Sequence, residues 1–296
     1  MQCIFCHKDT CLSKSVEHII PESLGNKDIW FPKGYVCDEC NHYFAIKIEK
    51  ELLNQPYFIS LRCRNEIRSK KNKFVKQDMI FPEAHKKAGV SFQTQGNSLL
   101  LHIDDKDVIN SIIEGKSHRM IAEYLPEPEY PNPLLSRFLA KCAYEYFLFN
   151  MGKEKYDLCV NELLGQNTDI LKTLREYARF GKGKYWQYSQ RRIYSEGSFF
   201  IKDEENIPYE PLHEMSFFVK DYIRHSDDVV EAEIYYVLII AGIEYAICIS
   251  DPDISEYMTL TQEKEFFPLQ NKDEKILPFS KADFNPMFIK KGQKQE

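Results

Sequence analysis

The sequence predicts an α+β protein in which a small metal-stabilised finger is followed by a larger mixed domain. Three observations carry this prediction: two cysteine pairs near the N-terminus, helical periodicity between residues 105 and 180, and short alternating runs on either side of that stretch. We place the finger at residues 1–55 and a mixed helical and antiparallel-sheet domain at residues 56–296. A further boundary is expected in the proline-rich segment 125–133.

The composition is that of a globular protein of one or two modest domains. Of the 296 residues, 43% are hydrophobic and 28% are charged, which is ordinary for such a chain. The most apolar stretch, residues 234–249, contains Glu244 and the pair Ala241-Gly242, so it predicts two strands and not a membrane helix. The beginning of the sequence has neither a basic leader nor a long apolar core, and we expect a cytoplasmic location.

The net charge of −6 argues against indiscriminate coating of nucleic acid, although one face can still be basic. Nine cysteines without a secretory leader favour a reducing compartment, where metal ligation is more common than disulfide formation. Five of them are scattered, and we interpret them as core or free thiols: Cys11, Cys63, Cys142, Cys159 and Cys248.

The expected elements follow from periodicity. A helix should begin near Asp38, carry the apolar stripe Phe44, Ile48 and Leu52, and end at Pro56. Residues 57–103 have the short apolar runs of a small antiparallel sheet. Residues 105–180 should be mainly helical, residues 185–268 should be strands with a hairpin around Ala241-Gly242, and the tail 290–296 should be disordered.

Two cysteine pairs define a metal site. Cys3-x-x-Cys6 and Cys37-x-x-Cys40 have the spacing with which each pair holds one side of a single ion, and together they predict a tetrahedral four-thiolate zinc site. A finger of this size has little apolar surface, so the zinc would supply stability. Ordinary buried cysteines are the alternative, and His7 or Cys11 stays open as a substitute ligand.

The segment between the pairs carries a second motif. Glu17-His18 is followed by Ile-Ile-Pro, and Asn41 comes directly after Cys40. This arrangement resembles the HNH endonuclease family, within it the branch whose ββα-metal finger is stabilised by four cysteines. The resemblance covers residues 3–52, less than a fifth of the chain.

The resemblance implies an HNH endonuclease that hydrolyses phosphodiester bonds with one catalytic metal ion and leaves a 5′-phosphate and a 3′-hydroxyl. His18 matches the general base, Glu17 the acidic residue before it, and Asn41 the metal-binding residue of the helix. DNA is the expected substrate. Many relatives of this finger cut DNA in phage, in mobile elements or in bacterial anti-phage defence, and these settings are expectations by analogy of fold.

The chemistry supports these roles independently. Phosphodiester hydrolysis needs a base to activate water and a cation to offset charge, and His18 has a suitable ordinary pKa. Glu17 and Asn41 offer the hard oxygen ligands that Mg²⁺ or Mn²⁺ prefers, so the zinc would be structural and a second metal catalytic. Glu17 is longer than the aspartate of many members, Asn26 is the nearest counterpart of the family's middle Asn, and His42 could replace or assist Asn41.

Two basic stretches are candidates for binding nucleic acid. The first follows the finger and the second mixes cations with aromatic rings, a combination that suits phosphate neutralisation and base stacking. The candidate residues are Arg62, Arg64, Arg68, Lys70, Lys71, Lys73, Lys184, Trp186, Arg191 and Arg192. A solvated charged face is the alternative for the first stretch, and a strand with a buried aromatic face is the alternative for the second.

A second class of function stays open. A non-catalytic zinc module that binds nucleic acid or protein would need the four cysteines but not Glu17, His18 or Asn41. His18 also has an alternative role that is structural: it could be a buried histidine whose hydrogen bonds are made within the protein, or an extra zinc ligand. The domain beyond residue 55 is expected to position substrate, sense a signal, or bind an activating protein partner or ligand.

Overall fold

The protein combines helices with antiparallel strands, which confirms the predicted α+β class. This computed structural model describes residues 1–69, 71–95, 98–151, 169–195, 199–202, 208–209, 212–223, 230–262 and 274–277. These residues form two compact units. The first unit contains Met1–Pro21, Asn26–Leu52 and the described part of Glu129–Leu277, and the second contains Glu22–Gly25 and Leu53–Pro128.

The finger consists of a short hairpin followed by a helical segment. Strand β1 (Glu17–His18) pairs with β2 (Trp30–Phe31) in antiparallel register, with His18 opposite Trp30. The helical segment runs through α1 (Asp38–Phe44), the π-helical η2 (Ala45–Glu49) and α2 (Lys50–Leu53). Its predicted stripe is confirmed, because Phe44, Ile48 and Leu52 are fully buried.

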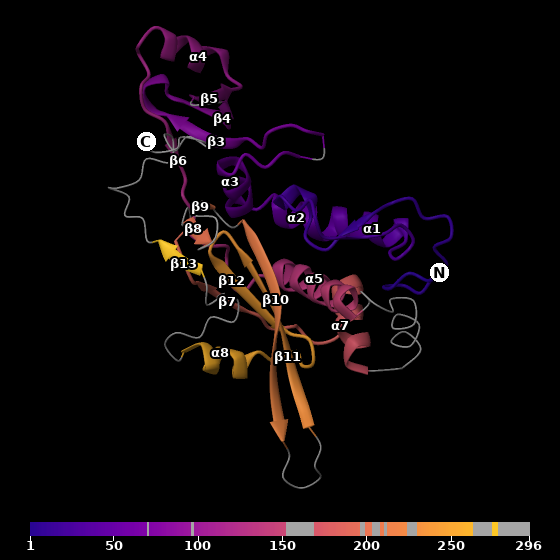
Figure 1. Cartoon of the computed structure of the whole chain (residues 1–296). Helices are drawn as coiled ribbons and strands as arrows, with labels where there is room; N and C mark the ends of the chain where they lie inside the picture. Colours follow the sequence, from indigo (N-terminus) through magenta and orange to yellow (C-terminus); the bar gives the residue numbers. More distant parts are fainter. Residues whose placement is uncertain are drawn as a thin grey trace. The chain divides into compact units, whose positions relative to one another are not determined.

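A four-stranded antiparallel sheet forms the centre of the rest of the first unit (Figure 1). Its strands, in spatial order, are β10 (His213–Ile223), β11 (Val230–Ile240), β12 (Ile243–Cys248) and β7 (Ser189–Arg192). Successive residues of β11 face opposite sides of the sheet. The ring of Tyr236 lies 5.7 Å from that of Tyr146 in helix α5 (Pro133–Met151), and the ring of Tyr235 lies 5.1 Å from that of Tyr257 in α8 (Ser255–Gln262).

The predicted hairpin around Ala241-Gly242 is confirmed as the turn between β11 and β12. Both residues have positive φ, 47° at Ala241 and 80° at Gly242, as two-residue turns of the primed type require. A Cβ atom at Gly242 would lie 2.3 Å from the carbonyl oxygen of Tyr194, so this position needs glycine.

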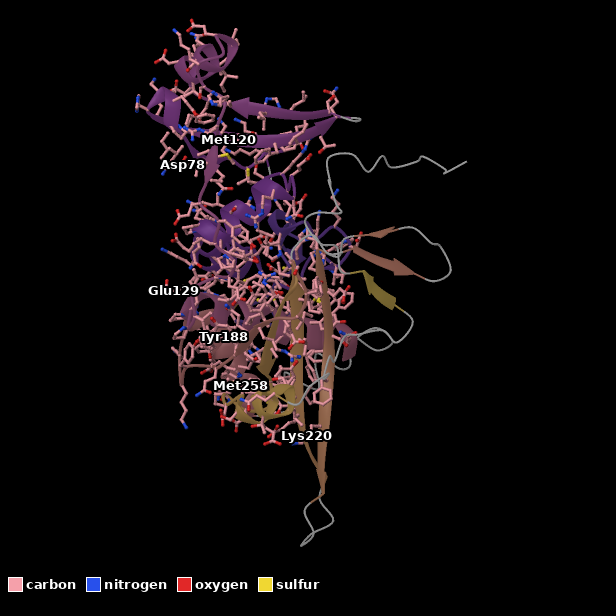
Figure 2. The ribbon with its side chains drawn as sticks, turned by 90° about the vertical axis from the view of Figure 1, so that its left-hand side faces the viewer. Asp78, Met120, Glu129, Tyr188, Lys220 and Met258 are labelled. Carbon is pink, nitrogen blue, oxygen red and sulfur yellow. The ribbon has the colours of Figure 1, made fainter. Side chains whose placement is uncertain are left out.

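Helix α5 begins where the proline-rich segment ends. Asn132 Oδ1 accepts the N–H groups of Leu134 and Leu135, both at 3.1 Å, and Pro133 occupies a position where no N–H is needed. Tyr188, labelled in Figure 2, accepts the N–H of Asn132 at 3.0 Å with its hydroxyl group. The predicted apolar stripe of α5 is buried at Leu135, Phe138, Leu139 and Cys142, and α7 (Asp169–Phe180) packs beside this helix.

The second unit contains the small antiparallel sheet predicted for residues 57–103. Its strands, in spatial order, are β5 (Ser98–Ile103), β4 (Lys86–Gln95), β3 (Gln77–Phe81) and β6 (Ile121–Ala122). The accompanying helices are η1 (Glu22–Leu24), α3 (Pro56–Arg64), η3 (Pro82–Ala84) and α4 (Lys106–Ile113). One core cluster joins Met79, Phe81, Ala88, Val90 and Val108.

Two predictions of local structure were wrong. The small sheet was expected from residue 57, but the finger helix ends at Leu53 and residues 57–64 belong to α3, which begins at Pro56 because proline fits the first position of a helix. Tyr57, Phe58 and Leu61 are buried from that helix. Helix α8 lies within the stretch predicted as strands, and Asp253 accepts the N–H of Ser255 at its start.

The remaining strands form a three-stranded sheet: β13 (Glu274–Leu277), β8 (Phe199–Lys202) and β9 (Pro208–Tyr209).

Some predictions fall outside the described residues, namely those for Lys70, Cys159 and the tail 290–296. Among the helices that are described, none has the length and the apolar character needed to cross a membrane.

The burial of α5 gives a first test. Leu139 is fully buried and Leu12 is 83% exposed, both in the first unit. Leu139→Ala should lower the free energy of unfolding by about 2–5 kcal/mol because it leaves a cavity, whereas Leu12→Ala should change it by less than about 0.5 kcal/mol. Denaturant unfolding of the two variants checks this, and equal effects would contradict the packing of α5.

Candidate active site and metal centre

Four cysteines meet at the start of α1. Cys37 is the N-cap of this helix, Cys40 lies in its first turn, and Cys3 and Cys6 come from the first turn of the chain. All four Sγ atoms lie within 4.8 Å of one another. Two main-chain N–H groups point at the sulfur atoms, from Cys37 to Cys3 Sγ and from Cys40 to Cys37 Sγ, each at 3.4 Å. The two Cys-x-x-Cys pairs therefore come together around one point, as the sequence predicts.

The electrostatics of this cluster suit a cation. A hydrogen bond from the Cys40 thiol, followed by main-chain N–H groups, lowers the pKa of Cys3 to about 4 despite burial. The same hydrogen bond and then burial raise the pKa of Cys40, and burial raises the pKa of Cys37 to about 11. The negative charge of one thiolate thus makes ionisation of the neighbouring thiols less favourable, and the positive charge of a bound zinc ion would offset this effect. The four sulfur atoms fit zinc, whose tetrahedral sites take thiolates at about 2.3 Å.

The two substitute ligands lie outside this cluster. His7 Nε2 contacts Arg175 Nη1, and burial followed by the charge of Arg175 lowers the pKa of His7. Cys11 is exposed and its thiol donates to Asp9 at 2.8 Å. Among the described residues, the group of three or more His, Cys, Asp or Glu side chains placed to hold a metal ion consists of the four cysteines.

An arginine of α7 contacts the cysteine cluster. Arg179 Nε donates to Cys40 Sγ at 3.2 Å, and its guanidinium lies 3.8 Å from the centre of the Tyr43 ring. Arg137 of α5 donates to the Tyr43 hydroxyl at 2.8 Å and to the carbonyl of Ala178 at 3.0 Å. Such hydrogen bonds to ligand atoms orient and stabilise metal sites. Sequence reasoning missed Arg179, because it lies 139 residues from Cys40 and no local pattern connects the two.

A hydrogen bond connects the helix of Asn41 with the residue directly before the strand of His18. His18 belongs to β1 and is half-buried, and Asn41 lies in the first turn of α1. Asn41 Nδ2 donates to the carbonyl of Val16 at 2.9 Å, two residues before His18. This bond turns the amide nitrogen toward β1 and leaves the amide oxygen for another partner. His42, the other candidate ligand on α1, is exposed.

Asn26 braces the loop between β1 and β2. Its amide nitrogen donates to the carbonyls of Ile20 and Ile29 at 2.7 and 2.8 Å, and its oxygen accepts the N–H groups of Asp28 and Ile29 at 3.1 Å each. The side chain is 1% exposed. Asn26, the nearest counterpart of the family's middle Asn, thus bonds both ends of the loop that precedes β2.

Glu17 lies in a buried group of charges and not at an exposed metal position. Its side chain is 4% exposed, and Oε1 lies 2.6 Å from Nζ of the fully buried Lys141 in α5. Glu49 and Glu145 approach the same Nζ at 3.1 and 3.2 Å. Burial alone would lower the pKa of Lys141, but Glu145, Glu17 and Glu49 outweigh it and raise that pKa. Burial raises the pKa of Glu145 well above its ordinary value.

Sequence reasoning also missed Lys141, Glu49 and Glu145. The available signal was the pair Lys141 and Glu145, four residues apart and beside the buried Cys142 in an apolar helix. A charged pair on that face needs partners from another segment, but the sequence does not show which.

The first basic stretch is only partly exposed. Arg62 is buried, Arg64 donates to Ser60 and lies 5.5 Å from the centre of the Tyr124 ring, and Arg68 lies 4.3 Å from the centre of the Phe74 ring. Arg68 itself is exposed, and so are Lys71 and Lys73. These exposed cations all belong to the second unit.

The second stretch has mainly structural contacts. Lys184 is exposed, but Trp186 is fully buried and its indole N–H donates to the carbonyl of Cys248 at 2.5 Å, so its ring offers no face to a base. Arg191 Nε is bonded to the buried Glu244 at 2.7 Å. Arg192 donates to the carbonyls of Tyr194 and Ala241, at 3.3 Å each.

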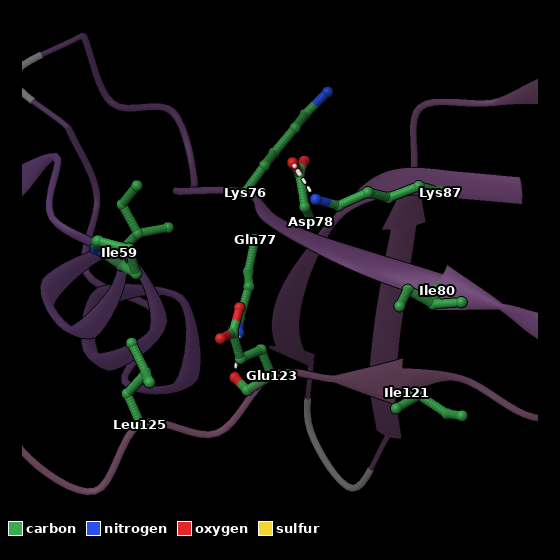
Figure 3. Close-up of a pocket in the computed structure, with 10 residues that line it drawn as sticks. Ile59, Lys76, Gln77, Asp78, Ile80, Lys87, Ile121, Glu123 and Leu125 are labelled. Carbon is green, nitrogen blue, oxygen red and sulfur yellow. Dashed lines mark hydrogen bonds and ion pairs between the residues drawn. The ribbon is translucent and has the colours of Figure 1, made fainter.

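The second unit also contains a pocket, with a volume of about 310 Å³ (Figure 3). Its apolar wall includes Ile80 and Ile121. On its polar side, Lys87 pairs with Asp78 at 3.3 Å and Gln77 Nε2 donates to the carbonyl of Glu123 at 3.1 Å.

The comparison with known families agrees with the geometry of the finger. Residues 3–57 match the family model described as HNH endonuclease. No curated protein and no solved structure shows a significant match to the chain. The chain thus carries an N-terminal HNH domain with a four-cysteine cluster, which supports a nuclease-type function and a nucleic-acid substrate. The match spans less than a fifth of the 296 residues and identifies this domain, not the whole protein.

Zinc content tests the cluster. The purified protein should hold about one zinc ion per chain, and Cys40→Ser should reduce this to less than about half and lower Tm, because one of four ligands is lost. Cys248→Ser is the matched control, since Cys248 is also buried in the first unit but lies outside the cluster. Elemental analysis decides: full occupancy in Cys40→Ser, or equal loss in both variants, would contradict the assignment.

Proposed function

We propose that the protein is a metal-dependent HNH endonuclease that hydrolyses phosphodiester bonds of DNA. The observation that carries this proposal is the bond between Asn41 Nδ2 and the carbonyl of Val16, which ties the helix of the candidate metal ligand to the residue directly before the strand of the candidate base. The HNH family match over residues 3–57 supports the same class of reaction.

His18 is the general base in this proposal. It is half-buried on β1, and an imidazole is suited to accept a proton from the attacking water. The Asn26 bonds fix the loop that follows, so that the strand returns to β2 in one conformation.

The amide oxygen of Asn41 would hold the catalytic cation, and His42, next to it on α1, is an additional candidate ligand. A bound Mg²⁺ or Mn²⁺ supplies a positive charge that offsets charge on the phosphate and the leaving oxygen. The zinc at the four cysteines has a structural role, because its four protein ligands leave no open position.

The exposed cations are the proposed phosphate contacts. Arg68, Lys71, Lys73 and Lys184 are exposed and can neutralise phosphates without reading sequence. By analogy with relatives of the finger, we place the enzyme in anti-phage defence or in a mobile element. A protein partner or ligand that activates it would protect the host DNA.

Cleavage by a histidine variant tests the proposal. The zinc-loaded protein with Mg²⁺ or Mn²⁺ should cut duplex DNA, and His18→Ala should lower kcat by about 10²-fold or more through loss of the general base. Zinc content and Tm should stay unchanged. His102→Ala is the matched control, because His102 is exposed on β5 of the second unit.

The outcomes separate the two classes of function. Equal cleavage by the parent and His18→Ala would contradict the role of His18. Binding of DNA without cleavage by either protein would favour the non-catalytic zinc module, which needs the cysteines but not His18. Single-stranded DNA and RNA in the same assay establish which nucleic acid is cut.

A further inference from the structure

A fully buried ammonium group lies beside the strand of His18. Lys141 Nζ has five oxygen atoms within 3.3 Å. Two are main-chain carbonyl oxygens, of His18 at 2.8 Å and Ile19 at 3.3 Å. The other three belong to the carboxyl groups of Glu17, Glu49 and Glu145 described above. The ammonium therefore contacts β1, η2 and its own helix α5.

Stability alone does not account for an ammonium at this place. Removing a charge from water is costly, and well-packed apolar side chains of similar volume are often equally stabilising or better. An ammonium differs from an apolar group in that its three N–H bonds have direction. At Lys141, one of the two shortest contacts of Nζ is to the main chain of His18.

The strand that carries His18 depends on such contacts. Strands β1 and β2 have two residues each, so their ladder contributes little order. Asn41 fixes the carbonyl of Val16 from α1, and Lys141 fixes the carbonyl of His18 from α5. Two side chains from separate helices thus hold two carbonyl groups in and next to the same short strand.

We propose that Lys141 is a positioning residue for His18, and that Glu17 serves as the ionised partner of Lys141 and not as a ligand of the catalytic cation. The role of Glu17 follows from its burial and from its short contact with Nζ, 2.6 Å. The inference rests on the proposed function in one respect, the use of His18 as the base.

The experiment follows the imidazole of His18 in the full-length, zinc-loaded protein. Ring ¹H–¹³C spectra of histidine-labelled protein resolve the eight histidines, and His18→Ala identifies the signal of His18. Lys141→Met and Glu17→Gln should shift this signal and leave the other histidines in place. In the cleavage assay both variants should lower kcat by about tenfold or more with KM for DNA unchanged, because misplacement of the base acts on the chemical step.

Glu145→Gln is the matched control. Glu145 lies in the same cluster, but it contacts Nζ from the same helix as Lys141, so Gln at this position leaves the contacts of Nζ with Glu17 and His18 of β1 in place. This variant should leave the His18 signal and kcat unchanged. Equal shifts for Glu145→Gln and Glu17→Gln, or an unchanged His18 signal in folded Lys141→Met, would overturn the proposal.

Two further outcomes are also decisive. If the parent does not cleave DNA but the His18 signal shifts as expected, the proposed function fails while the positioning contact stands. If Lys141→Met does not fold, the double variant Lys141→Met/Glu17→Gln is used in its place. The double variant removes one positive and one negative charge together. Global loss of the fold in both would overturn the positioning role, because the cluster would then be a requirement of the whole core.

Discussion

A buried ammonium ion needs oxygen atoms around it, and Lys141 obtains them from β1, η2 and α5. This requirement connects the finger to a helix more than 120 residues further along the chain. The two-residue hairpin of the finger could not order His18 by its own ladder. Side chains on two helices, Lys141 of α5 and Asn41 of α1, therefore add contacts to the segment that carries the proposed base.

The cysteine cluster has a similar connection. Arg179 of α7 donates to Cys40, and Arg137 of α5 contacts Tyr43, three residues beyond Cys40. The thiol cluster and the ammonium cluster thus each receive a cation from outside the segment that matches the HNH family. Because metal sites depend on such surrounding contacts, helices α5 and α7 of the first unit contribute to the surroundings of the candidate site.

The sequence revealed those parts of the site whose spacing is local. The two cysteine pairs, the stripe of the finger helix and the Ala241-Gly242 turn each depend on residues a few positions apart, and the structure contains them. Lys141 and Arg179 could not be found in this way, because their partners lie 123 and 139 residues away. The sequence left the second basic stretch ambiguous, because a Trp beside cations can either stack on a base or pack in the core. In the structure Trp186 is buried in the core.

The most direct measurement of the central claim is the chemistry of the cut ends. Full-length, zinc-loaded protein is incubated with an end-labelled DNA duplex and Mg²⁺ or Mn²⁺, and the product ends are identified with phosphatase and ligase. Water activated by His18, with cleavage of the bond to the 3′-oxygen, predicts 5′-phosphate and 3′-hydroxyl ends that a ligase rejoins. Products with a 3′-phosphate, or cleavage that continues in the presence of a chelator that removes both metals, would contradict the account.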